Sequence, residues 1–188
     1  LGRLPGGALM GLGVAMGAVF LLSLVLGGGA PRPAAPGGAQ KPLPARPGKG
    51  PVPRIWPLPG HPTVSSGFGW RNHPVSGKRH FHTGIDIPAP RGTPVACPVA
   101  GTVLRIDRDC GGADRCPNGN AVFVLDTEGL RWAFLHLDTV TVRVGENVRP
   151  GWIVGTVGSS GQTTGAHLHL QVILPDGSSK NPLTLVTA

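Results

Sequence analysis

Tyrosine is absent from this 188-residue sequence, cysteine occurs only three times, and the first 54 residues contain no acidic side chain. With so few aromatic residues, the chain has little material for the exposed aromatic platform of a carbohydrate- or wall-binding module. Three cysteines cannot form a structural zinc site with four cysteine ligands. After residue 54, no ten-residue stretch has helical periodicity, so β-structure is expected there.

The net charge of +8 is unevenly distributed. The first 54 residues hold six of the 17 basic residues, which are Arg3, Arg32, Lys41, Arg46, Lys49 and Arg54. The remainder has 11 basic and nine acidic residues, a net charge of only +2. A nucleic-acid-binding domain needs a concentrated basic face, so we predict no nucleic-acid partner. The basic segment suits contact with an anionic membrane or wall polymer, or it only keeps the chain soluble and extended.

Residues 8–26, ALMGLGVAMGAVFLLSLVL, are apolar except for Ser23. Nineteen residues in an α-helix span roughly the ~30 Å hydrocarbon core of a bilayer. We therefore predict that residues 1–30 form a membrane anchor. The alternative is a cleaved secretory signal, because Gly28 and Ala30 resemble a small-x-small cleavage site. Either outcome exports the rest of the chain, so we expect an extracytoplasmic domain of the cell envelope, tethered to the membrane or secreted.

Residues 31–54 contain a proline every few positions and no apolar periodicity, which predicts a semi-extended linker. From residue 55 the sequence changes to short runs rich in Val, Leu, Ile and Thr, separated by turn residues. Such runs are typical of β-strands. We predict that residues 55–188 form an all-β domain, a mostly antiparallel sheet or sandwich, with hairpin turns at TEG (127–129) and PDG (175–177).

Two of the three cysteines, Cys110 and Cys116, bracket the short segment GGADR. In an exported protein they are candidates for a disulfide bond that closes this loop. Cys97 lies in the predicted strand VACPV, where a small buried hydrophobic side chain is the usual role. A nucleophilic Cys97 with a histidine as base is the competing interpretation, but it leaves the histidine patterns described next unexplained.

Two predicted strands place histidines on a defined face. In HLHLQV, His167 and His169 alternate with leucines, so both imidazoles point away from the apolar side chains. In RWAFLHL, the same alternation places His136 on one face with Trp132 and Phe134. A single histidine of this kind is usually a surface residue or a satisfied core residue.

The segment RHFHTGIDI (79–87) adds His80, His82 and Asp86. His82 and Asp86 are four residues apart, so an extended chain places them on one side. Together with the histidines of the two strands, they form an unusual concentration of metal-binding atoms in one small domain. Two imidazoles and a carboxylate that leave a fourth position open are the ligand set of a catalytic zinc site.

These segments, in this order, resemble the lysostaphin-type or LytM-type zinc metallopeptidase domain. The resemblance runs from about residue 61 to 185 and rests on SSGFGWRNHPVSGKRHFHTGIDIPAPRGTPVACPVAGTV, with its His-x-x-x-Asp motif, and on TGAHLHLQV, with its His-x-His motif. It implies a mostly antiparallel β fold of LytM type, one zinc ion per domain, and hydrolysis of peptide bonds in bacterial peptidoglycan.

Carried over residue by residue, the resemblance makes His82, Asp86 and His169 the zinc ligands and His136 and His167 the catalytic histidines. Members that have lost ligands act as non-catalytic scaffolds or as activators of other wall hydrolases, which is the alternative function. Because all five residues are present, we predict an active endopeptidase of cell-wall remodelling. The resemblance leaves open which peptidoglycan bond is cut and whether a regulatory protein takes part.

Three further positions carry weaker expectations from the resemblance. Arg71 and Asn72 follow FGW and match a region that borders the cleft in the family, where they bind substrate or pin the loop. Phe134 stands where a tyrosine is usual, which predicts one hydroxyl group fewer in the cleft.

Overall fold

The computed structural model describes residues 54–72, 77–108 and 116–187. These residues form β-strands, turns and one short 3₁₀ helix and contain no α-helix, which confirms the predicted all-β fold. The elements are β1 (Gly69–Asn72), β2 (Arg79–His82), β3 (Gly84–Pro88), β4 (Pro94–Ala96), β5 (Gly101–Asp107), β6 (Asn120–Asp126), β7 (Arg131–Val140), β8 (Asn147–Val148), β9 (Ile153–Val157), β10 (His167–Ile173), β11 (Ser179–Lys180) and the 3₁₀ helix η1 (Pro182–Thr184).

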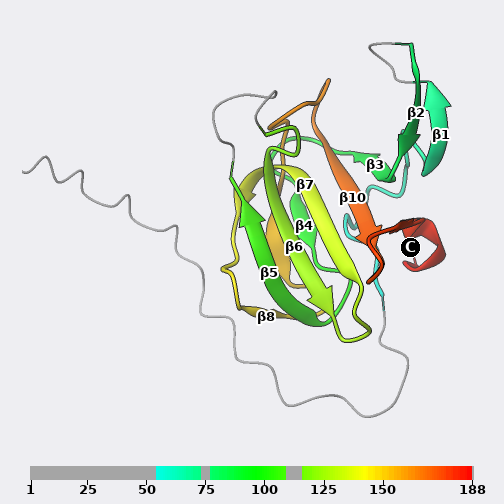
Figure 1. Ribbon diagram of the computed structural model, residues 1–188. Helices are drawn as coiled ribbons and strands as arrows, with labels where there is room; N and C mark the ends of the chain where they lie inside the picture. The colour runs from blue at the N-terminus through cyan, green and yellow to red at the C-terminus, as the bar shows by residue number, and fades with distance from the viewer. Residues whose placement is uncertain (1–53, 73–76, 109–115, 188) are drawn as a thin grey trace, which may run out of the picture. The chain divides into compact units, whose positions relative to one another are not determined.

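The strands form two sheets, and within each sheet the paired strands are antiparallel. In the larger sheet β11, β10, β7, β6, β5 and β8 lie side by side, β3 also pairs with β10, and β9 joins β7 to β4 (Figure 1). Strands β1 and β2 form a separate two-stranded hairpin. Because the same residues of β10 pair with both β3 and β7, β10 lies between these two strands.

Strand β10 turns its aliphatic side chains into the core. Leu168, Leu170 and Val172 are 0% exposed and belong to the main hydrophobic cluster. Burying a side chain of this size contributes about 1.5–3 kcal/mol. A slip of one residue would exchange the core face with the opposite face, so this burial fixes the register of the strand. It therefore keeps His167 and His169 out of the core, as the alternation predicts.

Both predicted hairpin turns are present. Gly129, between β6 and β7, has φ 85°, and Gly177, between β10 and β11, has φ 88°. The N–H of each glycine donates to a carbonyl three residues earlier, Asp126 O at 3.2 Å and Leu174 O at 3.0 Å. Glycine adopts this left-handed conformation without steric cost, which is why these positions close the hairpins.

The prediction for strand β7 is wrong in one respect. Trp132 and Phe134 are 0% exposed in the core, whereas His136 lies with Leu135 in the wall of a cleft. Between Phe134 and Leu137, two residues of β7 oppose one residue of β6, which is a β-bulge. His136 has φ 62°, a left-handed conformation that is rare for residues other than glycine. The bulge reverses the alternation and turns His136 away from the core face.

Two smaller expectations can also be compared with the structure. Because Phe134 is fully buried in the core, the absent tyrosine hydroxyl concerns the core and not the cleft, contrary to the sequence prediction. Cys97 is 0% exposed, and its thiol lies 3.2 Å from Val99 O. Burial raises the pKa of the Cys97 thiol to about 12, so the predicted role as an inert core residue is confirmed.

Several predictions fall outside the described residues. They are the membrane anchor or signal at residues 1–30, all of the linker at 31–54 except Arg54, and Cys110 of the expected disulfide with Cys116. In the part of the chain that is described, no helix has the length and apolar character needed to cross a bilayer. The anchor, the linker and the disulfide therefore stay predictions.

Candidate metal centre and active-site cleft

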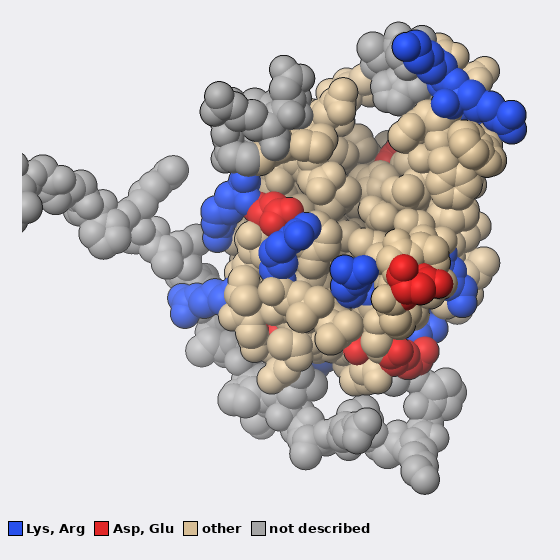
Figure 2. Space-filling view, in the orientation of Figure 1, with Lys and Arg blue, Asp and Glu red and all other residues tan. Residues whose placement is uncertain are grey.

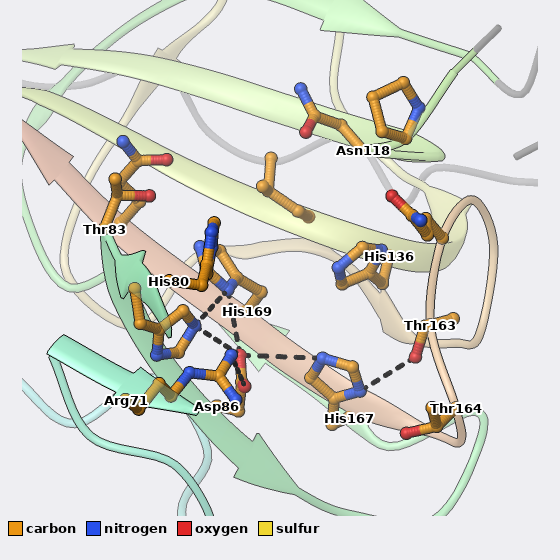
Figure 3. A pocket seen from close by; sticks show the side chains of 15 residues that line it. Arg71, His80, Thr83, Asp86, Asn118, His136, Thr163, Thr164, His167 and His169 are labelled. Carbon is orange, nitrogen blue, oxygen red and sulfur yellow. Dashed lines mark hydrogen bonds and ion pairs between the residues drawn. The ribbon is translucent and has the colours of Figure 1, made fainter. Parts of the chain in front are cut away.

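A cleft of ≈ 630 Å³ opens beside β10. Side chains from β1, β2, β3, β7 and β10 line it, together with residues 117–118 and the loop 162–164 (Figure 3). It contains all five residues that the sequence singled out as ligands or catalytic groups, which are His82, Asp86, His136, His167 and His169. Positions up to 87 residues apart in the chain, such as His82 and His169, are in direct contact here.

Three of these side chains converge on one point. His82 Nε2 lies 3.1 Å from His169 Nδ1 and 3.2 Å from Asp86 Oδ1, and His169 Nδ1 lies 2.8 Å from Asp86 Oδ1. The three residues can each offer one ligand atom to a metal ion. Donor atoms about 2.0–2.1 Å from a tetrahedral zinc ion lie roughly 3.3 Å apart, so the observed spacing is close to that of three zinc ligands. The donor set therefore fits a zinc ion.

The main chain orients the imidazole of His82. Its Nδ1 lies 2.8 Å from Gly67 O, a carbonyl that can only accept a hydrogen bond. Nδ1 is therefore the protonated nitrogen, and Nε2 presents its lone pair toward Asp86 and His169. A hydrogen bond of this kind to the non-ligating nitrogen is typical of metal-binding histidines, because it fixes both tautomer and ring orientation.

The electrostatics of the cluster favour the forms that bind a cation. Burial alone would raise the pKa of Asp86, but hydrogen bonds and charge from His169 and His82 hold it well below its usual range. Burial also lowers the pKa of His169, against the opposing effect of Asp86. At neutral pH the cluster is thus a carboxylate next to a neutral imidazole, which is the protonation state that a metal ion requires.

Gly84 is a residue of this site that the sequence reasoning missed. A Cβ atom at this position would lie 2.3 Å from Leu170 O and 2.7 Å from His169 Nε2. Only glycine lets β3 and β10 pair while the His169 ring occupies the space beside the main chain. Its position between the two ligands of RHFHTGIDI was the signal that could have identified it.

His136 occupies the other end of the cleft. Its Nδ1 lies 2.9 Å from Ser160 O, so Nδ1 carries the proton and Nε2 is a free acceptor. The side chain is largely buried, and burial lowers the pKa of His136 to about 4, although the bond to Ser160 opposes this. His136 is therefore neutral at pH 7 and can accept a proton there.

His167 lies next to His136, with ring centroids 4.9 Å apart. Its Nδ1 contacts Gly165 O at 2.9 Å and Thr163 Oγ1 at 3.2 Å, both in the segment that precedes β10. Its Nε2 points the other way, 3.6 Å from Asp86 Oδ1 (Figure 3). His167 thus contacts both the three-residue cluster and His136, which itself lies 6.0 Å from His169 between ring centroids.

The hairpin residues divide between two sides of β1 and β2. Arg71 lines the cleft, where its Nη2 atom lies 3.6 Å from Asp86 Oδ2. His80 also lines the cleft. Asn72 is exposed and does not line the cleft, so the structure separates two residues that the sequence had grouped. A substrate-binding role for Arg71 and Asn72 stays a prediction.

Comparison with known proteins agrees with this geometry. Residues 80–182 match the profile of Peptidase family M23. The protein named DD-carboxypeptidase/endopeptidase Mpg of Neisseria meningitidis is 38% identical over 122 residues, which are 65% of this chain and 26% of that protein. The chain thus spans about a quarter of the length of this relative.

Two solved structures are similar in fold. The catalytic domain of the antimicrobial peptidase lysostaphin from Staphylococcus simulans is 27% identical with a TM-score of 0.56, over 65% of this chain and 90% of that domain. A zinc-containing peptidase from Vibrio cholerae is 28% identical with a TM-score of 0.60, over 69% of this chain and 39% of that protein. The family match covers more than half of the chain. The chain therefore belongs to peptidase family M23, and its β domain is of the metallo-endopeptidase type.

Proposed function

We propose that this protein is a zinc-dependent endopeptidase that hydrolyses peptide bonds in bacterial peptidoglycan. The observation that carries the proposal is the convergence of His82, Asp86 and His169 at zinc-ligand spacing, with two further imidazoles in the same cleft. The names of the relatives supply the substrate class. A protein of Vibrio cholerae that is 37% identical over 123 residues is named peptidoglycan DD-endopeptidase ShyC, and Mpg is named DD-carboxypeptidase/endopeptidase.

In this proposal His82 Nε2, Asp86 Oδ1 and His169 Nδ1 hold one Zn²⁺. A bound zinc ion supplies Lewis-acid polarisation of the scissile carbonyl and activation of the attacking water. Arg71 Nη2 lies 3.6 Å from Asp86 Oδ2 and would hold that oxygen away from the three donor atoms. The remaining chemistry belongs to the two histidines outside the ligand set.

We assign the proton-accepting role to His136, because its Nε2 is unprotonated at neutral pH and faces the cleft. Its Nε2 takes a proton from the attacking water as the water oxygen bonds to the carbonyl carbon. The same nitrogen then gives the proton to the leaving nitrogen as the C–N bond breaks, which leaves a carboxylic acid and an amine. The acid then ionises at neutral pH and gives its proton to the amine or to solvent. His167, when protonated, donates from Nε2 to the developing oxyanion. Backbone carbonyls hold both rings, so neither has to reorient during the reaction.

We also propose that the enzyme works outside the cytoplasmic membrane. A peptidoglycan substrate lies there, and the apolar residues 8–26 would supply the export signal or anchor. The basic residues that follow would keep the domain near an anionic surface. Fusing a reporter enzyme that is active only after export to the C-terminus tests this directly, with a chain lacking residues 1–30 as control.

The test of the proposed activity is mass spectrometry of peptidoglycan fragments after incubation with the 188-residue chain. The first sample contains no additive, the second contains a zinc chelator, and the third contains the chelator and an excess of zinc. We expect cross-linked dimers to disappear, or new peptide termini to form, in the first and third samples only. Intact peptidoglycan in all three, with zinc bound, would instead favour the non-catalytic scaffold.

A further inference from the structure

The β1–β2 hairpin has two faces with different chemistry. In its register Arg71 pairs with His80 and Gly69 with His82, so these side chains share one face, and the three that are not glycine line the cleft. Trp70 pairs with Phe81 on the opposite face, because side chains alternate along each strand. The hairpin is thus one wall of the cleft and carries an outer face that the proposed peptidase chemistry does not use.

The outer face holds an aromatic ring that is both exposed and ordered. Trp70 is 64% exposed. Phe81 packs against it edge to face at a centroid distance of 5.4 Å, and Phe68 supports Phe81 in the same way at 5.2 Å. The Arg79 guanidinium lies 5.0 Å from the centroid of the Trp70 ring. The indole is therefore held in place before any partner binds, which reduces the entropy lost on binding.

We propose that this outer face, made by Trp70, Arg79 and Asn72, binds the sugar rings of the peptidoglycan glycan strand while the attached stem peptide occupies the cleft. This inference rests on the proposed function. An indole face buries the apolar C–H face of a sugar ring, and tryptophan and arginine are the side chains that most often dominate binding surfaces. The platform shares its two strands with the cleft wall, so one branched substrate can contact both.

Charge and polarity support a wall polymer as the occupant. Lys and Arg side chains gather at the hairpin, on the upper right of Figure 2, and complement the carboxylates of peptidoglycan. Asn72 lies on the same face as Trp70 and offers an amide to sugar hydroxyl and acetamido groups. A membrane-inserting face needs several apolar side chains together, but in the described part of the hairpin Trp70 is the single large apolar residue that is exposed.

The small number of aromatic residues in the sequence predicted that the chain has no such platform. The structure shows that three of them, Phe68, Trp70 and Phe81, come together at one hairpin. Asn72, which the sequence placed at the cleft, gains a role on the other side of the same strand. The platform depends on where these aromatic residues lie in the fold and not on how many the chain contains.

The test measures binding of the zinc-loaded 188-residue chain to peptide-free glycan strands, and tryptophan fluorescence and calorimetry monitor the binding. These strands contain no peptide bond, so binding is measured without hydrolysis. We expect Trp70→Ala to weaken binding at least about tenfold and Trp70→Phe to retain most of it. Val144→Ala is the matched control, since Val144 is 63% exposed on another part of the domain. Equal thermal unfolding midpoints verify that all the variants fold.

Wild-type affinity in Trp70→Ala, or no binding of glycan strands by the wild type, would overturn the proposal. Binding to vesicles of anionic phospholipid that requires Trp70, without binding to glycan, would overturn it in favour of a membrane surface. Failure of this proposal can be distinguished from failure of the proposed function. A wild type that binds glycan but cuts no peptidoglycan contradicts the peptidase alone, and one that cuts peptidoglycan but ignores glycan contradicts the platform alone.

Discussion

The two ends of the cleft are built differently. At one end His82, Asp86 and His169 contact one another directly, with donor atoms 2.8–3.2 Å apart. At the other end His136 and His167 each bond through Nδ1 to a main-chain carbonyl, Ser160 O and Gly165 O, both at 2.9 Å. The ring centroids of the two histidines at each end are equally far apart, 4.9 Å, but only at the first end do ligand atoms converge on one point.

This difference indicates a division of labour. Three converging donors, of which one is a carboxylate, are stable together only when they share a proton or a cation. His136 and His167 lie outside this donor set, and the carbonyls that hold their Nδ1 atoms keep a fixed tautomer without any ion, so they are suited to moving protons. Substitutions at the first end should therefore remove the metal and the activity, and substitutions at the second end the activity alone.

The largest effect is expected for Asp86→Asn. The amide keeps the shape of the side chain but removes the charge that balances the ion, so zinc binding and hydrolysis should both fall below detection. Zinc content by elemental analysis and peptidoglycan release measure the two effects. Asp107→Asn, at the end of β5, is the control and should behave as wild type. Stoichiometric zinc in Asp86→Asn would break the assignment of this residue as a ligand.

His136→Asn should reduce turnover by about 10²–10⁴-fold while zinc content stays at one per chain. Asparagine is chosen because His136 has φ 62°, a conformation that asparagine tolerates and alanine does not. The variant therefore removes the imidazole without straining the bulge. Turnover close to wild type would mean that another group takes the proton.

Gly84→Ala tests the support of the metal end. Its Cβ would lie within 2.7 Å of His169 Nε2 and closer still to Leu170 O, so the ring or the strand must move. We expect zinc affinity to fall about 10–100-fold, the range for residues that orient metal ligands, and activity to recover in excess zinc. Competition with a chelator measures the affinity. Unchanged affinity would show that β3 and β10 separate without cost.

The burial of His136 predicts a pH-dependent stability. Its pKa is about 4 in the folded protein and about 6.5 when unfolded, so the unfolded chain binds the proton first as the pH falls. The stability contributed by the neutral imidazole is then complete well above pH 6.5 and is lost toward pH 4, by about 2 kcal/mol between pH 8 and pH 5. Urea unfolding should show that the free energy of unfolding of the zinc-free wild type falls more steeply with decreasing pH than that of zinc-free His136→Asn. If the free energies of unfolding of the wild type and of His136→Asn change in parallel with pH, His136 is not a buried neutral imidazole.

The smallest effect is expected for Thr163→Val. It removes the hydroxyl 3.2 Å from His167 Nδ1 but leaves Gly165 O, which accepts the same proton at 2.9 Å. Activity should fall less than about tenfold, the value of a single net hydrogen bond. A larger loss would show that the hydroxyl, and not the carbonyl, orients His167.

The sequence predicted those features that alternate regularly. The burial of Leu168 and Leu170 in the core follows from strict alternation, and with it the position of His167 and His169 on the opposite face, where they line the cleft. Alternation failed at His136, because a bulge with a left-handed residue leaves no periodic signal in the sequence. Asn72 was misplaced for a related reason: neighbouring residues of a strand point to opposite faces. The Trp70 platform depends on the pairing of β1 with β2, and the number of aromatic residues in the sequence gives no information about that pairing.

The most direct test of the division within the cleft compares zinc binding by His167→Ala and His169→Ala. The two residues lie two apart on the same face of β10, and both reach Asp86, His169 at 2.8 Å and His167 at 3.6 Å. We expect one tightly bound zinc ion per chain in His167→Ala and none in His169→Ala. Equal loss of zinc in both variants, or retention in His169→Ala, would contradict this division.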